Sequence, residues 1–593
     1  MISALLFLAA SLALGIIAAR KISADNQLVY ALPLSVLLGT WTVFVLSLTV
    51  GFNQNSVTAS SLILAVAAFV LHTLWKKQKT ALLSNEITPL FLASLFFFTV
   101  FAWVVFHYDA NGNVAGIRTD FGFHHTIIAS LANGNFPPQN PFFAGHSLVY
   151  YYFTHLYSAT LVVGGMPLQE ASWLPLIIIN ASVACLFFLL ARKWFPSSRA
   201  LSYLALFLFL FNGSLAFVPW AEKNHLTLEN IAQVFPNPKF YSGALREAFP
   251  FENILTTQLL LSFAIPMAFA IMLMVLLSLE NKKTVAILVG LLPMFHFFAF
   301  VVLSLFLLTY VLLFERKREW LGAFAIAGAL SIPQLLFFTQ KSADAASAVQ
   351  MRLGWTAAQQ NIQSIVGFWL ANLGPYLILG TLGWFLIKNK QVRNIAIATL
   401  PAFFIANLFI FTPYAWDNFK LFFLFFIVLA ILAAFALEKT KALPFGGVVF
   451  PVLLVLMTLS GVLSVWTIAA HTNDVVYPKA DVEMCEWAHA NIPKNSLFLN
   501  DGSQSCLFST EGQRVFMGFE EWVANHGYSY GEQLKENDAT LAGDCELIRK
   551  NAIDYVFIGG SAGRNTAASA TFLAEKTTLV FENNASRIYK PNC

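Results

Sequence analysis

Long apolar runs separated by short polar segments dominate the chain from residue 2 to about residue 470. Most runs approach the roughly 20 residues that an α-helix needs to cross the hydrocarbon core of a bilayer. The stretch 284–314 is longer, with His296 near its middle, so it fits either one long helix or two short ones. The other predicted helices lie near residues 2–19, 28–51, 57–75, 88–106, 171–191, 199–219, 255–279, 320–340, 364–387, 394–412, 418–437 and 446–469.

Basic residues between the apolar runs predict how the helices are oriented, because Lys and Arg concentrate in cytoplasmic loops. All seven basic clusters lie on the cytoplasmic side of the membrane under two conditions. The stretch 284–314 must cross the membrane twice, and the Tyr-containing run 148–165 must not cross it. This arrangement gives fourteen spans with both termini outside, and it places 148–165 at the membrane interface or in a re-entrant segment. The larger loops and the C-terminal tail then share the outer face. The clusters lie at residues 20–21, 76–79, 192–199, 282–283, 316–318, 388–393 and 439–441.

The pattern changes after about residue 471, where short amphipathic segments replace the long apolar runs. VEMCEWAHANI is typical of an amphipathic helix, while SLFLN, DYVFIGG, TLVFEN and SRIYKP have the composition of strands. Alternating helices and strands predict a small α/β domain of about 120 residues. No glycine-rich phosphate-binding motif occurs in it, so nucleotide binding has no support.

Composition agrees with a membrane protein, because 58% of the residues are hydrophobic and only 11% are charged. The net charge of +4 includes no basic cluster that would indicate a nucleic-acid partner. Four of the five cysteines lie in the tail, and Cys185 lies in an apolar run. The four permit two disulfides in any of three pairings, which would place the tail in an oxidising compartment, or they remain free thiols.

The most unusual polar segment is TDFGFHHTIIASLANGNFPPQNPFFAGHSLVYYY, residues 119–152. Its spacing predicts a short interfacial helix that begins at Thr119 or Asp120 and ends near Gly134, with His124 one turn after Asp120. The prolines that follow restrict the chain, and a rigid loop suits a site that must hold its geometry. Simpler interpretations are an N-cap at Asp120, worth about 1 kcal/mol, and an aromatic belt at the tyrosines. Asp109 is a competing acid in the same loop.

DFGFHHTIIASLANGNFPPQNPFFAGHSLVYYY resembles the first extracytoplasmic loop of the GT-C glycosyltransferase superfamily, in particular its poorly characterised "YYY" membrane-protein branch. Members of this branch carry an acid, then a histidine, then G-FPP-NP-FAG…YYY. WDNFK at 416–420, MGFEEWVANHGY and IDYVFIGG extend the resemblance from about residue 88 to the end of the chain. It predicts a GT-C-like transmembrane domain over 88–470 with a catalytic outer loop at 107–170, and an extracytoplasmic domain over 471–593. The first helices, in 1–87, lie outside it.

The resemblance implies sugar transfer from a polyprenyl-phosphate-linked donor to an unidentified acceptor, with inversion at the sugar. The acid of the family's first loop corresponds in position to Asp120, which is then the general base or holds the acceptor or a metal. Asp120, His124 and His125 could also bind a divalent cation, with Asp120 and His124 as the first candidates. The departing phosphate needs a cation, for which Lys420 is a candidate, although a lysine there also fits a snorkelling anchor. If this hypothesis is right, Asp120 and a cation such as Lys420 face one cavity. The candidate catalytic residues are Asp120, His124 and Asp417, and the candidate substrate-binding residues are His125, Tyr150, Tyr151, Tyr152, Arg246, His296, Arg352 and Lys420.

Two other functions compete with glycosyl transfer. A transporter or flippase would move a lipid-linked or polar substrate without covalent chemistry, and a sensor would use the helices as an anchor. Transporters usually carry charges or broken helices near the middle of the membrane, whereas here the polar residues concentrate in the outer loops. The sequence therefore favours an enzyme: a polytopic α-helical protein of the cell (inner) membrane, GT-C-like, with about fourteen spans and a small extracytoplasmic α/β domain.

Overall fold

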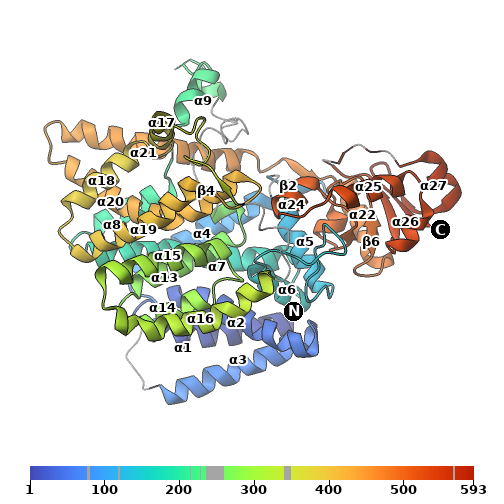
Figure 1. Cartoon of the computed structure of the whole chain (residues 1–593), viewed down its shortest axis with the longest axis horizontal. Helices are drawn as coiled ribbons and strands as arrows, with labels where there is room; N and C mark the ends of the chain where they lie inside the picture. Colours follow the sequence, from blue (N-terminus) through green and yellow to red (C-terminus); the bar gives the residue numbers. More distant parts are fainter. Residues whose placement is uncertain are drawn as a thin grey trace.

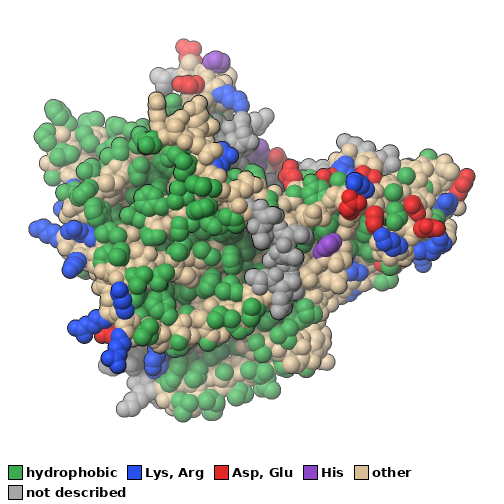
Figure 2. Space-filling model, viewed as in Figure 1, with side chains coloured by type: hydrophobic (Ala, Val, Ile, Leu, Met, Phe, Trp, Pro, Cys, Tyr) green, Lys and Arg blue, Asp and Glu red, His purple; other side chains and the backbone are tan. Residues whose placement is uncertain are grey.

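The computed structural model describes residues 1–75, 81–117, 120–213, 215–227, 229–234, 259–339, 349–561, 563–564, 566 and 568–593. Figure 1 shows a body of packed helices from which the C-terminal domain projects to one side. The hydrophobic surface covers the helical body, and Lys and Arg side chains gather at the end of that body farthest from the C-terminal domain (Figure 2).

Nine helices within the described ranges are long and apolar enough to cross a membrane. A tenth span arises if α17 (Ile362–Leu373) and α18 (Pro375–Leu386), which are bent by 89° at their junction, are counted as one. The nine are α1 (Ile2–Ala19), α2 (Gln27–Val50), α3 (Gln54–Leu74), α4 (Ile87–Val105), α7 (Leu168–Trp194), α15 (Phe297–Phe314), α16 (Lys317–Thr339), α20 (Phe423–Thr440) with the 3₁₀ turn η2 (Ala415–Phe422) before it, and α21 (Gly446–Ala470).

The expected fourteen spans are therefore not confirmed. Several predicted spans form helices of only 9 to 13 residues, which extend about 14–20 Å and fall short of a hydrocarbon core of about 30 Å. They are α8 (Arg199–Leu210), α13 (Ile265–Leu277) and α14 (Lys282–Gly290). The stretch 284–314 forms two helices, α14 and α15, which is one of the two predicted alternatives. The run 148–165 contains α6 (Phe153–Val163), whose 11 residues are too few to cross.

The remaining described elements of the helical body are short, except α19 (Lys390–Leu408), which has 19 residues and overlaps the span predicted at 394–412 but is not among the nine. The first outer loop forms α5 (Phe121–Ala132), where the sequence predicts a short helix. The others are α9 (Phe217–Lys223), α10 (Ile231–Val234) and the strand pair β3 (Gln350–Met351) and β4 (Phe409–Ile410).

The C-terminal domain is built on a five-stranded mixed sheet of order β7-β6-β8-β10-β9. Strand β6 pairs in parallel with β7 and with the central strand β8, whereas β10 runs antiparallel to β8 and β9. The strands are β6 (Leu497–Leu499), β7 (Arg514–Val515), β8 (Tyr555–Ile558), β9 (Thr577–Glu582) and β10 (Arg587–Pro591). The four strands expected from SLFLN, DYVFIGG, TLVFEN and SRIYKP are therefore confirmed.

Six helices accompany this sheet in the described part of the tail, and two of them, α25 and α26, are separated by a short break. Gly543 lies at the break with a φ of 110°, a conformation that favours glycine and ends the first helix. The helices are α22 (Lys479–Asn491), α23 (Cys506–Ser509), α24 (Glu520–Asn525), α25 (Gly531–Leu541), α26 (Cys545–Lys550) and α27 (Ala570–Lys576).

The domain is fastened to the first outer loop by backbone pairing. Strand β5 (Val475–Tyr477), at the start of the tail, joins β2 (Val114–Gly116), which pairs with β1 (Phe106–Tyr108). Beyond the sheet edge at β7, the Val515 amide donates to the Pro141 carbonyl at 2.9 Å and the Gly518 amide to Phe142 at 2.8 Å. The proline-rich loop thus covers an edge strand, so that loop and domain form one continuous scaffold.

Contact with α5 completes the junction. Gly512 has a φ of 63°, and a Cβ placed on it would lie 2.4 Å from the Ala129 carbonyl carbon, so a side chain there would force the domain away from α5. Asn133, at the end of α5, donates through Nδ2 to the Glu511 carbonyl at 2.6 Å. The position of α5 is therefore set by the C-terminal domain as well as by the helical body.

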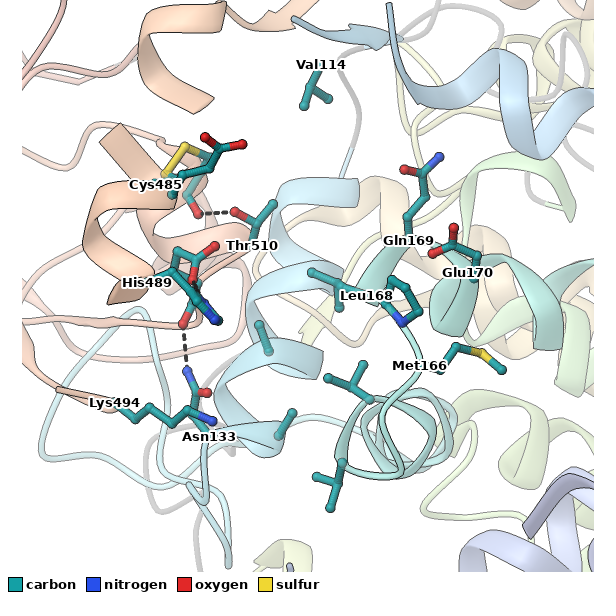
Figure 3. Close-up of a pocket in the computed structure, with 18 of the residues that line it drawn as sticks. Val114, Asn133, Met166, Leu168, Gln169, Glu170, Cys485, His489, Lys494 and Thr510 are labelled. Carbon is teal, nitrogen blue, oxygen red and sulfur yellow. Dashed lines mark hydrogen bonds and ion pairs between the residues drawn. A yellow bond between two sulfur atoms is a disulfide. The ribbon is translucent and has the colours of Figure 1, made fainter. Parts of the chain in front are cut away.

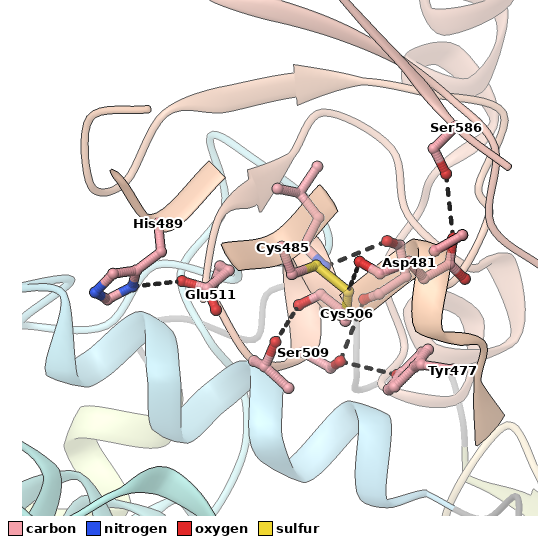
Figure 4. The surroundings of a disulfide bond; sticks show 12 residues. Tyr477, Asp481, Cys485, His489, Cys506, Ser509, Glu511 and Ser586 are labelled. Atoms are coloured by element: carbon pink, nitrogen blue, oxygen red, sulfur yellow. Dashed lines mark hydrogen bonds and ion pairs between the residues drawn. A yellow bond between two sulfur atoms is a disulfide. The ribbon is translucent and has the colours of Figure 1, made fainter. Parts of the chain in front are cut away.

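The four tail cysteines form two disulfides, Cys485–Cys506 and Cys545–Cys593, while Cys185 is free and buried. Figure 4 shows the first, which links α22 to α23 beside Asp481, whose side chain accepts a hydrogen bond from Ser586 at 3.2 Å. The structure therefore contains disulfides rather than four free thiols in the tail.

Removing the Cys545–Cys593 bond is expected to destabilise the C-terminal domain. The bond closes a loop of 48 residues, and in the chain-entropy model such a cross-link contributes about 4 kcal/mol. The double variant Cys545→Ser/Cys593→Ser should therefore unfold at lower temperature and expose the tail to protease, while Cys185→Ala should leave the tail unchanged. Peptide mapping without reductant checks the pairing directly, and recovery of Cys545 as a free thiol would contradict it.

Candidate functional site

A cavity of about 490 Å³ lies where the N-terminal end of α5, the turn η2 and helix α24 of the C-terminal domain meet. Its titratable lining residues are three acids, one lysine and two histidines: Asp120, Asp417, Glu521, Lys420, His124 and His526. Its aromatic lining residues are Phe123, Tyr150, Tyr151, Tyr414, Trp416, Phe419 and Trp522. Asp120 and Lys420 therefore face one cavity, the arrangement that the glycosyltransferase hypothesis requires.

Asp120 occupies the N-cap position of α5, but its side chain makes no capping hydrogen bond. The capping contact comes from the backbone, because the Asp120 carbonyl accepts from the His124 amide at 2.9 Å. The helix dipole stabilises a carboxylate at this end. The simpler interpretation of Asp120 as a side-chain N-cap does not describe this geometry, and the exposed carboxylate lines the cavity instead.

Lys420 and Asp417 form an ion pair within η2, with Nζ 2.9 Å from Oδ1. Both side chains are largely shielded, at 13% and 24% exposure. The ammonium also lies 5.6 Å from the ring centres of Phe298 and Phe419, close enough for a cation–π contribution. The turn therefore holds one positive charge at a fixed place on the cavity wall, instead of leaving the lysine to snorkel freely.

The loop tyrosines and Phe123 form the aromatic side of the cavity. Tyr150 stacks on Tyr151 with ring centres 4.4 Å apart, and Phe123 stacks on His526 at 5.0 Å. Burial raises the pKa of both tyrosines well above its usual value, so at neutral pH they remain phenols that can donate hydrogen bonds. The wall is therefore apolar over its faces and polar at its tips.

The C-terminal domain supplies part of the wall, through Glu521, Trp522, Asn525 and His526 in and after α24. Burial lowers the pKa of His526, although a hydrogen bond to the Trp522 carbonyl opposes that shift. Sequence reasoning did not assign these residues to the site. The signal that could have found them is the MGFEEWVANHGY segment, in which polar and aromatic side chains are concentrated in and directly after one short helix.

Some predicted site residues do not reach the cavity. His125 points between Phe106 and Phe121, with ring centres at 4.8 and 5.5 Å, and neither ring nitrogen has a partner within the described ranges. Burial lowers its pKa to about 3, so it is neutral. Tyr152 is fully buried and is not among the lining residues.

The more distant candidates also fall outside the lining. His296 N-caps α15, accepting from the Ala299 amide at 3.1 Å, and contacts the lining residue Tyr151, with ring centres 4.7 Å apart. Arg352 follows β3 and donates to the Ala357 carbonyl at 3.5 Å. Arg246 lies outside the described residues. The cavity thus brings together six of the eleven predicted site residues: Asp120, His124, Tyr150, Tyr151, Asp417 and Lys420.

A preformed divalent-cation site was one predicted alternative for Asp120 and His124. Across the described ranges, no group of three or more His, Cys, Asp or Glu side chains is arranged to hold a metal ion. His125, the third residue considered for such a site, points away from the cavity.

A second cavity of about 880 Å³ lies near the other end of α5, between α22 and the start of α7 (Figure 3). His489 and Lys494 face it from the C-terminal domain, and Met166 and Leu168 from the membrane side. Glu511 accepts from His489 at 2.8 Å, but burial has the larger effect and raises the Glu511 pKa. This cavity is larger, yet the acid, histidine and tyrosines of the first outer loop converge on the smaller one.

The fold and the cavity define a multi-pass membrane protein whose C-terminal α/β domain helps to enclose a site. Residues 36–246 match the model of a family described as "Uncharacterized membrane protein (DUF2298)". The match covers about a third of the chain, including the whole first outer loop, and confirms the resemblance to poorly characterised membrane proteins. No curated protein matches the chain.

Two solved structures are similar to the chain at 12% sequence identity. One is the archaeal oligosaccharyltransferase AglB from Archaeoglobus fulgidus in complex with an inhibitory peptide and a dolichol-phosphate, with a TM-score of 0.37 over 80% of this chain and 70% of that chain. The other is the oligosaccharyltransferase of Archaeoglobus fulgidus in the apo form, with a TM-score of 0.38 over 79% of this chain and 69% of that chain. Similarity at this level assigns no function to the cavity.

Proposed function

We propose that the protein is a membrane glycosyltransferase that moves a sugar from a polyprenyl-phosphate-linked donor to an acceptor on the extracytoplasmic face. The observation that carries this proposal is the presence of Asp120 and Lys420 on the wall of one aromatic-lined cavity. The first can accept a proton and the second can stabilise a phosphate, and glycosyl transfer from a lipid phosphate needs both.

In the proposed step, an oxygen or nitrogen of the acceptor attacks the anomeric carbon of the donor sugar. Asp120 accepts the proton that the acceptor loses as the new glycosidic bond forms. The bond between the anomeric carbon and the phosphate oxygen breaks, and its electron pair leaves with the lipid phosphate. Lys420 stabilises the negative charge that develops there, and Asp417 holds the lysine in place.

The other walls fit the two parts of the donor. Aromatic faces with polar tips suit a sugar, which has apolar C–H faces and a rim of hydroxyls. Leu261 and Ile265 add apolar surface to the cavity wall and suit the first part of the lipid chain. Glu521, Trp522 and Asn525, on the side of the C-terminal domain, are then placed to contact the acceptor.

Two features support an extracytoplasmic cavity. The Lys and Arg side chains gather at the opposite end of the helical body (Figure 2), and such residues favour the cytoplasmic side. The C-terminal domain that lines the cavity holds two disulfides, which persist in oxidising compartments.

The competing transport function has one structural feature in its favour, the sharp break between α17 and α18. Discontinuous helices in transporters form the substrate site. Neither helix contributes a residue to the cavity, so the break is separate from the site proposed here.

The proposal is tested by following a radiolabelled sugar on a polyprenyl-phosphate carrier after mixing with purified protein and a membrane extract that supplies acceptors. The expected result is protein-dependent loss of label from the lipid and its appearance in a new product. No loss of label with any donor, together with protein-dependent movement of intact donor across proteoliposomes, would replace the proposal with transport.

Replacing Trp522 with alanine is expected to raise the KM for the acceptor about tenfold with a smaller effect on kcat. The indole lines the cavity and packs on Phe142 at 5.0 Å, and an aromatic contact contributes about 0.5–1.5 kcal/mol beyond its buried area. Trp487→Ala is the matched control, because that tryptophan of the same domain packs on Phe581, away from the cavity. Equal effects of the two changes would remove Trp522 from acceptor binding.

A further inference from the structure

Two histidines from different helices are hydrogen-bonded to each other beside the cavity. Nδ1 of His124, in α5, lies 2.8 Å from Nε2 of His155, in α6. His124 lines the cavity and is 5% exposed, whereas His155 is completely buried behind it. Two neutral imidazoles at this separation share one proton, so one ring must donate and the other accept.

The surroundings of the pair keep it uncharged. The ring of Phe263 lies 5.0 Å from that of His124 and 5.6 Å from that of His155, and Tyr150 contacts His155 edge-on at 5.5 Å. Burial lowers the pKa of His124 well below its usual value, and the neighbouring His155 and His125 lower it further. Neither ring accepts or donates a hydrogen bond to a carboxylate within the described ranges.

The buried ring decides which histidine donates. Nδ1 of His155 is buried and has no hydrogen-bond partner among the described residues. If His155 accepted through Nε2, its own proton would sit on Nδ1 as a buried N–H without an acceptor. If His155 donates through Nε2–H, Nδ1 carries only a lone pair. Among backbone groups, orphaned buried N–H donors are rarer than under-satisfied acceptors, and the same reasoning applied to the imidazole favours donation by His155.

We infer that His155 is a positioning residue whose Nε2–H donates to Nδ1 of His124 and thereby fixes His124 as the tautomer that presents its Nε2–H to the cavity. The hydrogen bond of one ring nitrogen sets the state of the other. His124 is then a neutral donor to an oxygen of the bound ligand, and proton acceptance is left to Asp120. A neutral N–H also adds a hydrogen-bond donor to a cavity wall whose three carboxylates only accept hydrogen bonds and whose charged donor is Lys420.

The inference rests on the proposed function only for the identity of the ligand, whose oxygen belongs to the phosphate or the sugar of the lipid-linked substrate. The hydrogen bond between the two rings does not depend on that function.

The position of the shared proton is measured by NMR on the full chain in nanodiscs with ¹⁵N-labelled histidine. The expected result is a coupling through the hydrogen bond between His155 Nε2 and His124 Nδ1, with the proton attached to His155. A proton attached to His124 Nδ1, or a doubly protonated His124 at neutral pH, would overturn the inference.

Activity gives the second readout. His155→Phe keeps a flat ring but removes the donor, and its kcat for sugar transfer should fall by about 10- to 100-fold, the range known for residues that orient metal-binding histidines. His155→Gln supplies an amide N–H near the same place and should recover most of this loss. His107→Phe, a buried histidine that stacks on Trp103 away from the cavity, should retain the wild-type rate.

The outcomes separate this inference from the proposed function. If the protein transfers no sugar but the spectrum shows His155 donating, the proposed function fails and the positioning role survives. If transfer occurs and His155→Phe is as fast as wild type, the positioning role fails. If the Phe variant does not fold, a slow but folded Gln variant would also count against the inference, because it keeps the donor.

Discussion

Replacing Asp120 with asparagine is expected to lower kcat for sugar transfer by about 10²- to 10⁴-fold, the contribution typical of a general base. Asparagine has nearly the same shape but cannot accept the proton of the acceptor. The change should leave α5 intact, because the Asp120 side chain makes no capping bond and asparagine is itself a good N-cap residue. Donor affinity should change little, so the loss should be seen in single-turnover measurements at saturating donor.

Asp109→Asn is the matched control for this prediction. Asp109 is the other acid of the same loop, but its carboxylate accepts from the backbone amides of Asn111 and Asn113 at 2.8 and 2.9 Å. Hydrogen bonds from Asn113 lower its pKa, and it is not among the residues that line the cavity. The variant should keep the wild-type rate. An equal loss of transfer rate in both variants would show that Asp120 is not the general base.

Replacing Lys420 with glutamine is expected to lower kcat by about 10²- to 10³-fold, as removal of one donor that stabilises a developing anion does in other enzymes. Asp417 and two aromatic rings hold the Lys420 ammonium in one place. The lysine side chain therefore has to move little when the phosphate departs. Lys420→Arg keeps the positive charge and should recover part of the rate, although its planar group differs from an ammonium.

Lys479→Gln serves as the control for the lysine. Lys479 also pairs with an acid on its own helix, at 3.8 Å from Glu483, but it is exposed on α22. Its loss should not change the transfer rate. A wild-type rate in Lys420→Gln would show that the cation for the leaving phosphate lies elsewhere, and a loss in Lys479→Gln would point to a general effect of charge.

The long helices could be predicted from the sequence because hydropathy and length specify a bilayer-spanning segment. The number of spans could not. Helix α13 is apolar and almost completely buried, and an apolar run alone does not distinguish a segment buried in protein from one that faces lipid. The charge rule then required fourteen crossings, because it constrains the side of each loop and says nothing about the length of the helix between two loops.

The part of the candidate site that lies within the first outer loop could be predicted from the sequence. The sequence placed both His124 and His125 in the site, but neighbouring helical residues differ by about 100° in direction, and only His124 faces the cavity. The contributions of α24 and His155 depend on tertiary contacts. His155 is a single polar residue within an apolar run, and nothing in its local spacing shows that it lies 2.8 Å from His124.

The most direct test of the central claim follows the fate of one label in proteoliposomes that contain either the wild-type protein or Asp120→Asn. The donor is a polyprenyl-phosphate-linked radiolabelled sugar, and both its release from lipid and its position across the bilayer are measured. The glycosyl-transfer account predicts that the wild-type protein moves the label from lipid to acceptor, whereas the variant leaves it on the lipid. Release at equal rates by both proteins, or translocation of intact donor without release, would contradict the account.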